Sequence, residues 1–185
     1  GGSRNQIPPG ATQPDKFLFD KGNEALAEKK WMSAREYFTT LIATYPQSTH
    51  RADAKLGLGD AYLGDGSHAS EVLGHTEFRE SLSLYPTHPR ADYAQYKLAM
   101  GHYAQMAKPG RDQTETREAI REFEAFFERY PNSGQMAEAK KNYREARDRA
   151  GQSDYQMGLT YYRIRWYPGA VSRFEELMKK DPEFT

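Results

Sequence analysis

The sequence predicts an all-α fold in which antiparallel helix pairs are stacked into a solenoid. Three observations carry this prediction. A stretch such as EAIREFEAFFERYP (118–131) occurs four times along the chain with the same skeleton. Each copy is closed by a proline, which has no N–H group and restricts the residue before it, so that a helix ends there. Each copy also follows a second helical pattern that contains a glycine, which places the helices in pairs.

The repeated stretch is predicted to be the second helix of each pair. In every copy a small residue is followed four positions later by phenylalanine and eight positions after that by proline. The four copies lie at 33–46, 73–86, 118–131 and 169–182, their small residues are Ala34, Gly74, Ala119 and Ala170, and their phenylalanines are Phe38, Phe78, Phe123 and Phe174. Residues four apart share one face of a helix, so this spacing predicts a buried stripe.

The first helix of each pair carries the glycine. The four glycines are Gly22, Gly59, Gly101 and Gly158. A glycine inside a helix costs about 1 kcal/mol relative to alanine, so these positions need a packing reason. We predict that each glycine faces the small residue of the helix that follows. Small residues at the helix contact, an aromatic residue and a closing proline are together typical of tetratricopeptide repeats.

The predicted domain organisation is a flexible lead-in at 1–14 and a single tetratricopeptide-repeat α-solenoid at 15–185. The lead-in is polar and rich in glycine and proline. The predicted repeats occupy about 15–48, 51–88, 90–133 and 151–184, with a connecting helix at 134–150. A solenoid ends in a polar capping element. None follows the fourth copy, so we expect the native protein to continue with a further repeat.

The composition argues against several classes of function. The 26 Lys and Arg residues balance the 26 Asp and Glu residues, and zero net charge gives no electrostatic basis for binding nucleic acid or anionic lipid. The absence of cysteine excludes a disulfide framework, a Cys-zinc site and a cysteine nucleophile. No apolar run approaches the roughly 20 residues of a transmembrane helix.

No catalytic, nucleotide-binding or metal site is predicted. The segment GLGDAYLGDG (57–66) lacks the Gly-Lys-Ser/Thr ending of a phosphate-binding loop. The histidines form no H-x-H or H-x-x-x-H pair, and no serine lies in a nucleophile elbow. We therefore expect a non-catalytic binding protein that needs no cofactor and no metal.

The concave side of such a solenoid is lined by the first helix of each pair. Positions three before, one after and four after each glycine are predicted to face it. These groove positions are Phe19, Asn23, Leu26, Leu56, Asp60, Leu63, Leu98, His102 and Gln105 in the first three repeats, and Tyr155, Leu159 and Tyr162 in the fourth. The lining favours an extended peptide with aromatic or aliphatic side chains. The alternative is that several of these apolar residues pack between repeats.

Three longer segments resemble the BamD family, the tetratricopeptide lipoproteins of the bacterial machinery that assembles β-barrel proteins in the outer membrane. They are SLYPTHPRADYAQYKLAMGHYAQ (83–105), TREAIREFEAFFERYPNS (116–133) and the segment 138–182, which contains YYRIRWYPGAVSRFEE. The resemblance to the BamD family therefore extends over nearly the whole chain after Asp15.

The resemblance implies a scaffold subunit at the periplasmic face of the outer membrane, anchored by a lipid on an N-terminal cysteine that this sequence lacks. It implies three kinds of partner, namely the POTRA domains of the barrel subunit BamA, other Bam lipoproteins, and the targeting strands of unfolded outer-membrane proteins. The family docks on BamA through its C-terminal repeats. The arginine it uses there matches Arg173, and Tyr155 and Tyr162 are expected to take part in docking. An ion pair between Arg173 and Glu176 within the helix is the alternative.

A second kind of protein remains compatible with the repeats. Periplasmic tetratricopeptide proteins of the Tol-Pal kind coordinate cell-envelope constriction or wall synthesis and also carry F…YPxS repeats. Their repeats are usually spaced more tightly, whereas this chain contains the long segment 134–150, which favours the resemblance to BamD.

Overall fold

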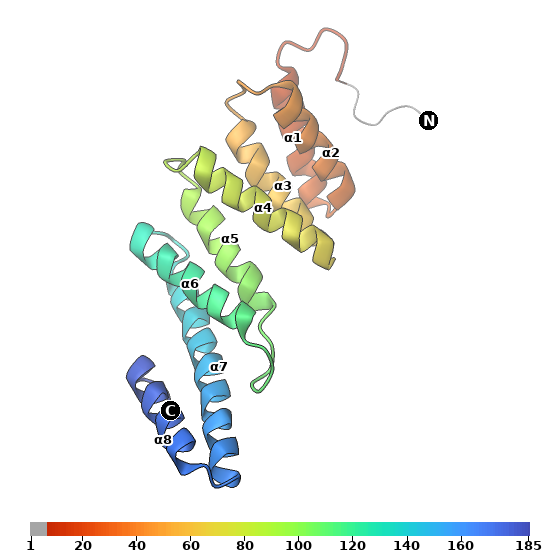
Figure 1. The fold of residues 1–185 in the computed structure, drawn as a ribbon. Helices are drawn as coiled ribbons and strands as arrows, with labels where there is room; N and C mark the ends of the chain where they lie inside the picture. Colours follow the sequence, from red (N-terminus) through yellow and green to blue (C-terminus); the bar gives the residue numbers. More distant parts are fainter. Residues whose placement is uncertain (1–6) are drawn as a thin grey trace. The chain divides into compact units, whose positions relative to one another are not determined.

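The computed structural model describes residues 7–185, and over these residues the chain forms eight α-helices and no strand (Figure 1). The helices are α1 (Pro14–Ala27), α2 (Trp31–Thr44), α3 (Arg51–Asp65), α4 (His68–Leu84), α5 (Ala91–Ala104), α6 (Thr114–Arg129), α7 (Met136–Arg163) and α8 (Tyr167–Lys180). The predicted all-α fold is confirmed.

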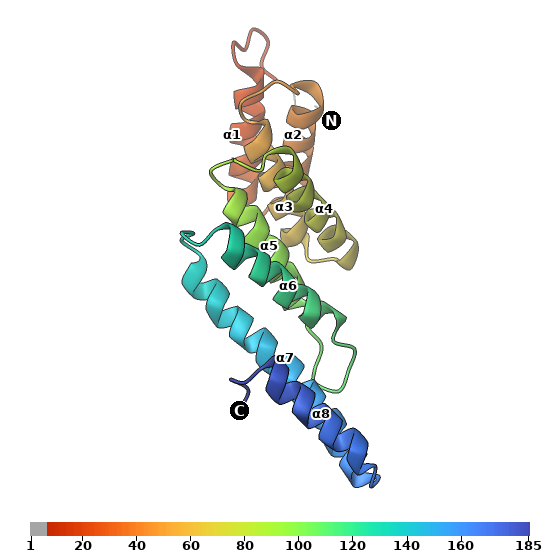
Figure 2. The ribbon, with the colours of Figure 1, turned by 60° about the vertical axis from the view of Figure 1, so that its left-hand side comes forward.

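Within each unit, helices that follow one another along the chain pack together. The contacting pairs include α1 with α2, α3 with α4, and α7 with α8, while α2 also packs on α3 and α6 on α7. Figure 2 shows α8 lying along the second half of α7. Contacts divide the chain into two compact units, the first ending at Ala94 and the second beginning at Gln95, within α5. A single solenoid over 15–185 stays a prediction.

Two predicted segments look different in the structure. The connecting helix predicted at 134–150 and the first helix of the fourth repeat form one continuous helix, α7, of 28 residues. In the predicted lead-in, residues 1–6 lie outside the described residues, and Ile7 packs against the core of the first unit. The C-terminal part of the lead-in is therefore in contact with the folded protein.

All four repeats end their second helix in the same way. A proline lies two residues after the last residue of α2, α4, α6 and α8. The residue before each proline leaves the helical conformation, with φ between −124° and −142°, as the bulk of the proline ring requires. These residues are Tyr45, Tyr85, Tyr130 and Asp181, and their carbonyls accept turn hydrogen bonds of 3.0–3.1 Å from the N–H groups of Ser48, His88, Ser133 and Phe184. The fourth copy thus places an aspartate where the others have tyrosine.

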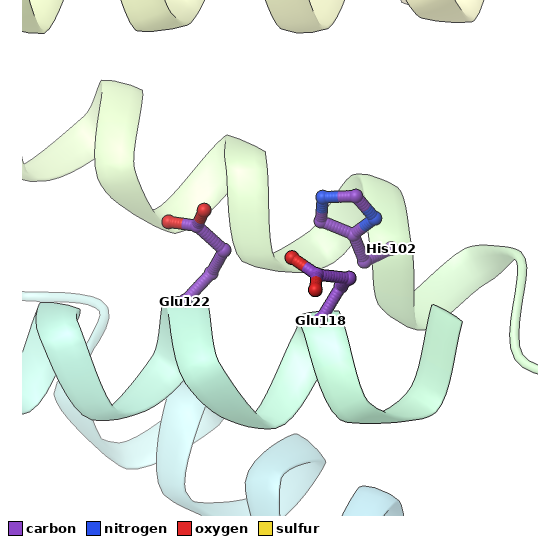
Figure 3. A group of neighbouring side chains, drawn as sticks. All are labelled: His102, Glu118 and Glu122. Atoms are coloured by element: carbon purple, nitrogen blue, oxygen red, sulfur yellow. The ribbon is translucent and has the colours of Figure 1, made fainter. Parts of the chain in front are cut away.

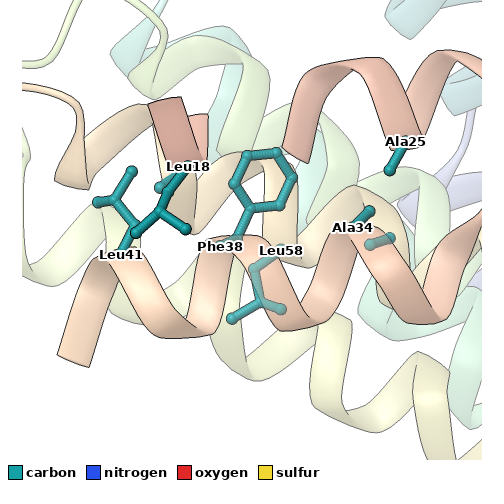
Figure 4. Close-up of a cluster of buried hydrophobic side chains, with 8 residues drawn as sticks. Leu18, Ala25, Ala34, Phe38, Leu41 and Leu58 are labelled. Carbon is teal, nitrogen blue, oxygen red and sulfur yellow. The ribbon is translucent and has the colours of Figure 1, made fainter. Parts of the chain in front are cut away.

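Phe38 forms the centre of the core of the first unit. Its side chain is fully buried, and its ring lies between Gly22 of α1 and Gly57 of α3. A Cβ atom on these glycines would come within 2.5 Å and 2.6 Å of ring carbons. Figure 4 shows the ring with its buried neighbours, which include Leu18, Ala34, Leu41 and Leu58. Both glycines are therefore needed to leave room for one aromatic ring.

The packing partner of the helical glycines differs from the prediction. The sequence pattern predicted contact with the small residue of the second helix, but the phenylalanine four residues later fills the space instead. The pairs are Gly22 with Phe38, Gly59 with Phe78, and Gly158 with Phe174. The predicted contact is also present in the second repeat, where a Cβ on Gly74 would lie 3.2 Å from the carbonyl oxygen of Gly59.

The core of the second unit is mainly aromatic. Phe123 and Phe126 of α6 are fully buried. Rings from the neighbouring helices meet them at steep angles, with centroids 6.4 Å apart for Tyr103 and Phe123 and 5.9 Å apart for Tyr96 and Phe126. Tyr143 of α7 completes the cluster through edge contacts with the rings of α6. Tilted and edge-on pairs of this kind add to the stabilisation from burial.

Ala119→Leu is expected to lower the free energy of unfolding by about 1–3 kcal/mol, because the larger side chain overpacks a filled core. Ala119 is fully buried in the cluster of the second unit. Urea unfolding followed by circular dichroism measures the effect. Ala137→Leu, at an exposed position of α7, is the matched control and should leave stability nearly unchanged. Equal stability of both variants would contradict the assigned helix contact.

Candidate partner-docking site

The predicted groove residues of α1 remain partly accessible. Asn23 is exposed, and Phe19 and Leu26 are half-buried against the core of the first unit. The Phe19 ring also stacks on His50, with ring centroids 4.8 Å apart. Their role in binding a peptide stays a prediction.

Leu56 and Leu98 were predicted to line the groove, and this part of the prediction is wrong. Their side chains are 1% and 0% exposed, so they belong to the protein interior. In α3 every residue from Ala54 to Gly59 is buried, and α3 packs against α1, α2 and α4. A helix covered on several sides has no single solvent face, so its spacing relative to the glycine does not identify groove positions.

The other predicted groove residues of the first three repeats have partners of their own. Both carboxylate oxygens of Asp60 accept from the Tyr93 hydroxyl, at 2.8 and 2.9 Å. Leu63 is half-buried beside Gly74, and Gln105 is exposed just beyond the end of α5. His102 Nδ1 lies 2.6 Å from a carboxylate oxygen of Glu115.

In the fourth repeat, aromatic side chains reach the surface. Tyr155 and Tyr162 are 39% and 57% exposed. Tyr155 rests on the Phe174 ring and Tyr162 on the Tyr167 ring, with centroids 5.6 Å and 5.5 Å apart. Each ring is thus held in place on one side and open on the other, as expected of an anchor for a partner. Leu159, the third predicted position, is half-buried.

Arg173 lies on α8 with its guanidinium 5.9 Å from the centre of the Tyr161 ring, in a cation–π arrangement. The ion pair with Glu176, the alternative raised by the sequence, does not form. None of the described residues supplies a carboxylate to Arg173. The side chain is half-buried, and its charge faces a cavity.

This cavity lies within the second unit and has a volume of about 640 Å³. Residues from the segment before α6, from the first turns of α6, and from α7 and α8 form its walls. The cationic side chains around it are Arg111, Arg117, Arg147, Arg173 and Lys180, and the acidic ones are Asp112, Asp154 and Asp181. Ile120, Met157 and Leu177 add apolar surface. We call this space the cationic cavity.

Two of the three carboxylates are already engaged. Asp112 accepts a hydrogen bond of 2.9 Å from the N–H of Thr114. Asp181 is buried and accepts from Arg144 at 2.5 Å and 3.2 Å, with Arg147 3.7 Å away. Burial alone would raise the pKa of Asp181, but the hydrogen bonds from Arg144 and the charges of both arginines hold this pKa below its usual value.

The remaining charges leave the cavity with excess positive charge. Over residues 7–185, no carboxylate forms an ion pair with Arg111, Arg117, Arg173 or Lys180, although Arg117 lies 3.3 Å from the Thr114 hydroxyl. Unpaired cations around a concave surface attract an anionic group, and arginine binds carboxylates through two parallel hydrogen bonds. The sequence did not reveal this site because its cations come from separate elements and form no local motif.

The second unit also contains a group of potential metal ligands, although no metal site was predicted from the sequence. Ligand atoms of His102, Glu118 and Glu122 all lie within 4.8 Å of one another (Figure 3). No spacing along the sequence indicates this group, because it combines one residue of α5 with two of α6.

None of the helices in the described part of the chain has the length and apolar character needed to cross a membrane.

Comparisons with known proteins agree on one family. The model of the YfiO family, described as an outer membrane lipoprotein, matches residues 11–185. The outer membrane protein assembly factor BamD of Caulobacter vibrioides is 26% identical over 91% of this chain and 54% of its own length. BamD of Xylella fastidiosa strain 9a5c is 26% identical over 92% of this chain and 61% of its own length. BamD of Vibrio cholerae is 26% identical over 92% of this chain and 73% of its own length. The chain thus spans between about half and three quarters of the length of these curated relatives.

A solved structure shows the same fold. The crystal structure of MamA protein matches with a TM-score of 0.50 and 15% sequence identity, over 94% of each chain. At this identity the likeness shows the fold alone.

Proposed function

This chain belongs to the YfiO family of outer membrane lipoproteins, and from this premise we propose that it is a non-catalytic scaffold subunit of the machinery that assembles β-barrel proteins in the outer membrane. The relatives named above are outer membrane protein assembly factors. The alternative of a Tol-Pal-type protein in envelope constriction receives no support from them. The proposed location is the periplasmic face of the outer membrane, where a lipid on the N-terminus of the native protein would hold it.

The proposed partners are the POTRA domains of BamA, other lipoproteins of the same complex, and the targeting strands of unfolded outer-membrane proteins. The partly exposed side chains of α1, Phe19, Asn23 and Leu26, are candidates to contact such a strand. The second unit offers the contact for BamA.

The observation that supports this docking site best is the free charge of Arg173. An arginine beside a cavity, without a carboxylate of its own, gains a strong hydrogen-bonded ion pair when a partner supplies one. The neighbouring cations favour an acidic segment and raise its association rate. Tyr155 and Tyr162 offer aromatic surface on the same repeat, so that a polar contact and apolar anchors occur together.

Arg173→Glu is expected to weaken binding of the isolated POTRA array of a cognate BamA by about 30-fold or more, because reversing the charge loses an interface ion pair and adds repulsion. Isothermal titration calorimetry measures the change. Lys179→Glu is the matched control, since it makes the same charge change on α8 outside the cationic cavity. Circular dichroism should show both variants folded.

Equal weakening by the two variants would mean that only net charge matters, and would reject the assigned contact. Binding unaffected by Arg173→Glu would reject it as well. Absence of any binding by the wild-type chain, tested also at low salt where charged contacts are strongest, would count against the proposed partner.

A further inference from the structure

We propose that His102, Glu118 and Glu122 form a binding site for a divalent transition-metal ion, with Zn²⁺ as the best-matched probe. The site is distinct from the proposed docking of BamA, because none of its residues lines the cationic cavity. The inference depends on five features of the second unit.

The first feature is the way two helices bring the three ligands together. Glu118 and Glu122 are four residues apart on α6, so their side chains leave the same face of the helix. His102 projects from the last turn of α5 toward that face (Figure 3). Their ligand atoms lie within 4.8 Å of one another. Ligand atoms of a tetrahedral zinc ion lie about 3.4 Å apart. The ligand atoms of the three side chains would therefore have to approach one another by up to about 1.4 Å when an ion binds.

The second feature is the orientation of the His102 ring. Its Nδ1 lies 2.6 Å from a carboxylate oxygen of Glu115, and the side chain is only 16% exposed. When Nδ1 donates its N–H to this carboxylate, Nε2 is the ring nitrogen that can coordinate a metal ion. Histidines that bind metal commonly donate their other N–H to a carboxylate in this way, which fixes the tautomer and makes the ligand more basic.

The third feature is a buried and fixed carboxylate. The Glu122 side chain is 5% exposed, and its Oε2 accepts a hydrogen bond of 2.6 Å from the Gln95 amide. Gln95 is itself buried and also donates to the main-chain carbonyl of Glu122, at 2.9 Å. The carboxylate is therefore oriented before any ion arrives. Glu118 is 36% exposed and has the freedom to complete the closure.

The fourth feature is the local charge. Glu115, Glu118 and Glu122 bring three carboxylates to the His102 ring. Arg121 supplies one positive charge, since its Nε donates to Glu118 at 3.1 Å and its Nη2 lies 3.6 Å from Glu122. A divalent cation would neutralise the remaining charge of this group. The Arg121 side chain is 65% exposed, so it can move into solvent when an ion replaces it.

The fifth feature is the chemical character of the ligands. One imidazole nitrogen with two carboxylate oxygens suits Zn²⁺, Mn²⁺ or Fe²⁺. Ca²⁺ takes six to eight oxygen ligands, and Mg²⁺ prefers an octahedron of oxygens, so neither matches this group. Water would complete a four-coordinate zinc ion.

Titration of the full chain with ZnCl₂ by isothermal titration calorimetry tests the proposal. We expect micromolar or tighter binding of one ion per chain and a rise in melting temperature that EDTA reverses, since an ion that binds only the folded state stabilises it. His102→Ala and Glu118→Gln should each weaken binding by about 100-fold. Glu115→Gln should weaken it by about 10-fold, because it loosens the His102 ring.

Two further variants separate a built site from an adventitious ion. His68→Ala is the matched control, because His68 is 87% exposed, lies 3.9 Å from a single glutamate, and is absent from the group. It should leave Zn²⁺ binding unchanged. Arg121→Gln should tighten binding by about tenfold, because it removes the cation that competes for the same carboxylates.

The proposal is overturned if the wild-type chain binds no Zn²⁺, or if His102→Ala and Glu118→Gln bind as the wild type does, which would indicate an adventitious ion only. Loss of binding in His68→Ala, or weaker binding in Arg121→Gln, would overturn it too. Circular dichroism identifies any variant that fails to fold. Glu118→Gln, at a half-exposed position, keeps the test decisive if His102→Ala is unfolded.

Discussion

Phe38→Ala is expected to lower the free energy of unfolding of the first unit by about 3–5 kcal/mol, the range for removing a fully buried aromatic side chain. The size of the effect follows from the position of the ring between Gly22 and Gly57, where two helices would face an empty space. Met32→Ala, on the same helix but at a position 67% exposed, is the control and should change stability little.

A double-mutant cycle tests whether glycine is needed because of the ring. In the wild-type chain Gly57→Ala is expected to destabilise, since the new Cβ would lie 2.6 Å from a carbon of the Phe38 ring. In a Phe38→Ala background the same change meets an open space and gains the higher helix propensity of alanine, about 1 kcal/mol. Equal effects of Gly57→Ala in both backgrounds would contradict the packing described here.

The chain offers a selective probe for these measurements. Its two tryptophans are Trp31 in the first unit and Trp166 in the second. Urea unfolding followed by tryptophan fluorescence in a Trp166→Phe background therefore reports on the first unit. The Phe38→Ala effect should appear there. The complementary Trp31→Phe background reports on the second unit.

Asp181→Ala is expected to lower the free energy of unfolding by about 2–4 kcal/mol at neutral pH. Removing one partner of a buried ion pair costs about 3–5 kcal/mol. The expectation is lower here because Arg144 is 34% exposed and keeps its contact with Asp148. Asp181 also joins the end of α8 to α7, through Arg144 and Arg147. Urea unfolding followed by the fluorescence of Trp166 measures the loss.

Asp148→Ala is a matched control, because Asp148 contacts the same guanidinium but is 53% exposed. An exposed pair within one helix contributes at most about 0.5 kcal/mol. Similar losses in the two variants would contradict the assignment of the stabilisation to the buried carboxylate.

The effect of Asp181 should also depend on pH in a defined direction. The pKa of this carboxyl is lower in the folded chain than its usual value, so the folded state favours the charged form. Its stabilisation is complete above the unfolded pKa of about 3.9 and is lost as the pH falls through the folded pKa. The stability difference between wild type and Asp181→Ala should therefore narrow below about pH 4. A constant difference would contradict the lowered pKa.

The sequence by itself determined the helical repeats. The repeated spacing of phenylalanine and proline predicted all four second helices, and each ends two residues before its proline. These features are local, because the helical period decides which residues share a face and a proline ends the helix that precedes it. For the same reason Phe38, Phe78 and Phe123 were correctly predicted to be buried.

Only the tertiary structure decided which groups meet across helices. Leu56 and Leu98 fit the spacing of a groove but lie in the interior, and α3, which carries Leu56, packs against α1, α2 and α4. The cations of the cavity come from positions 111 to 180, and the metal-ligand group joins α5 to α6. Such sites depend on distances between helices, which the period of a single helix does not contain. Asp181 illustrates both kinds of information. Its position after α8 follows from the repeat in the sequence, whereas its ion pairs depend on the tertiary structure, which places Arg144 and Arg147 of α7 beside it.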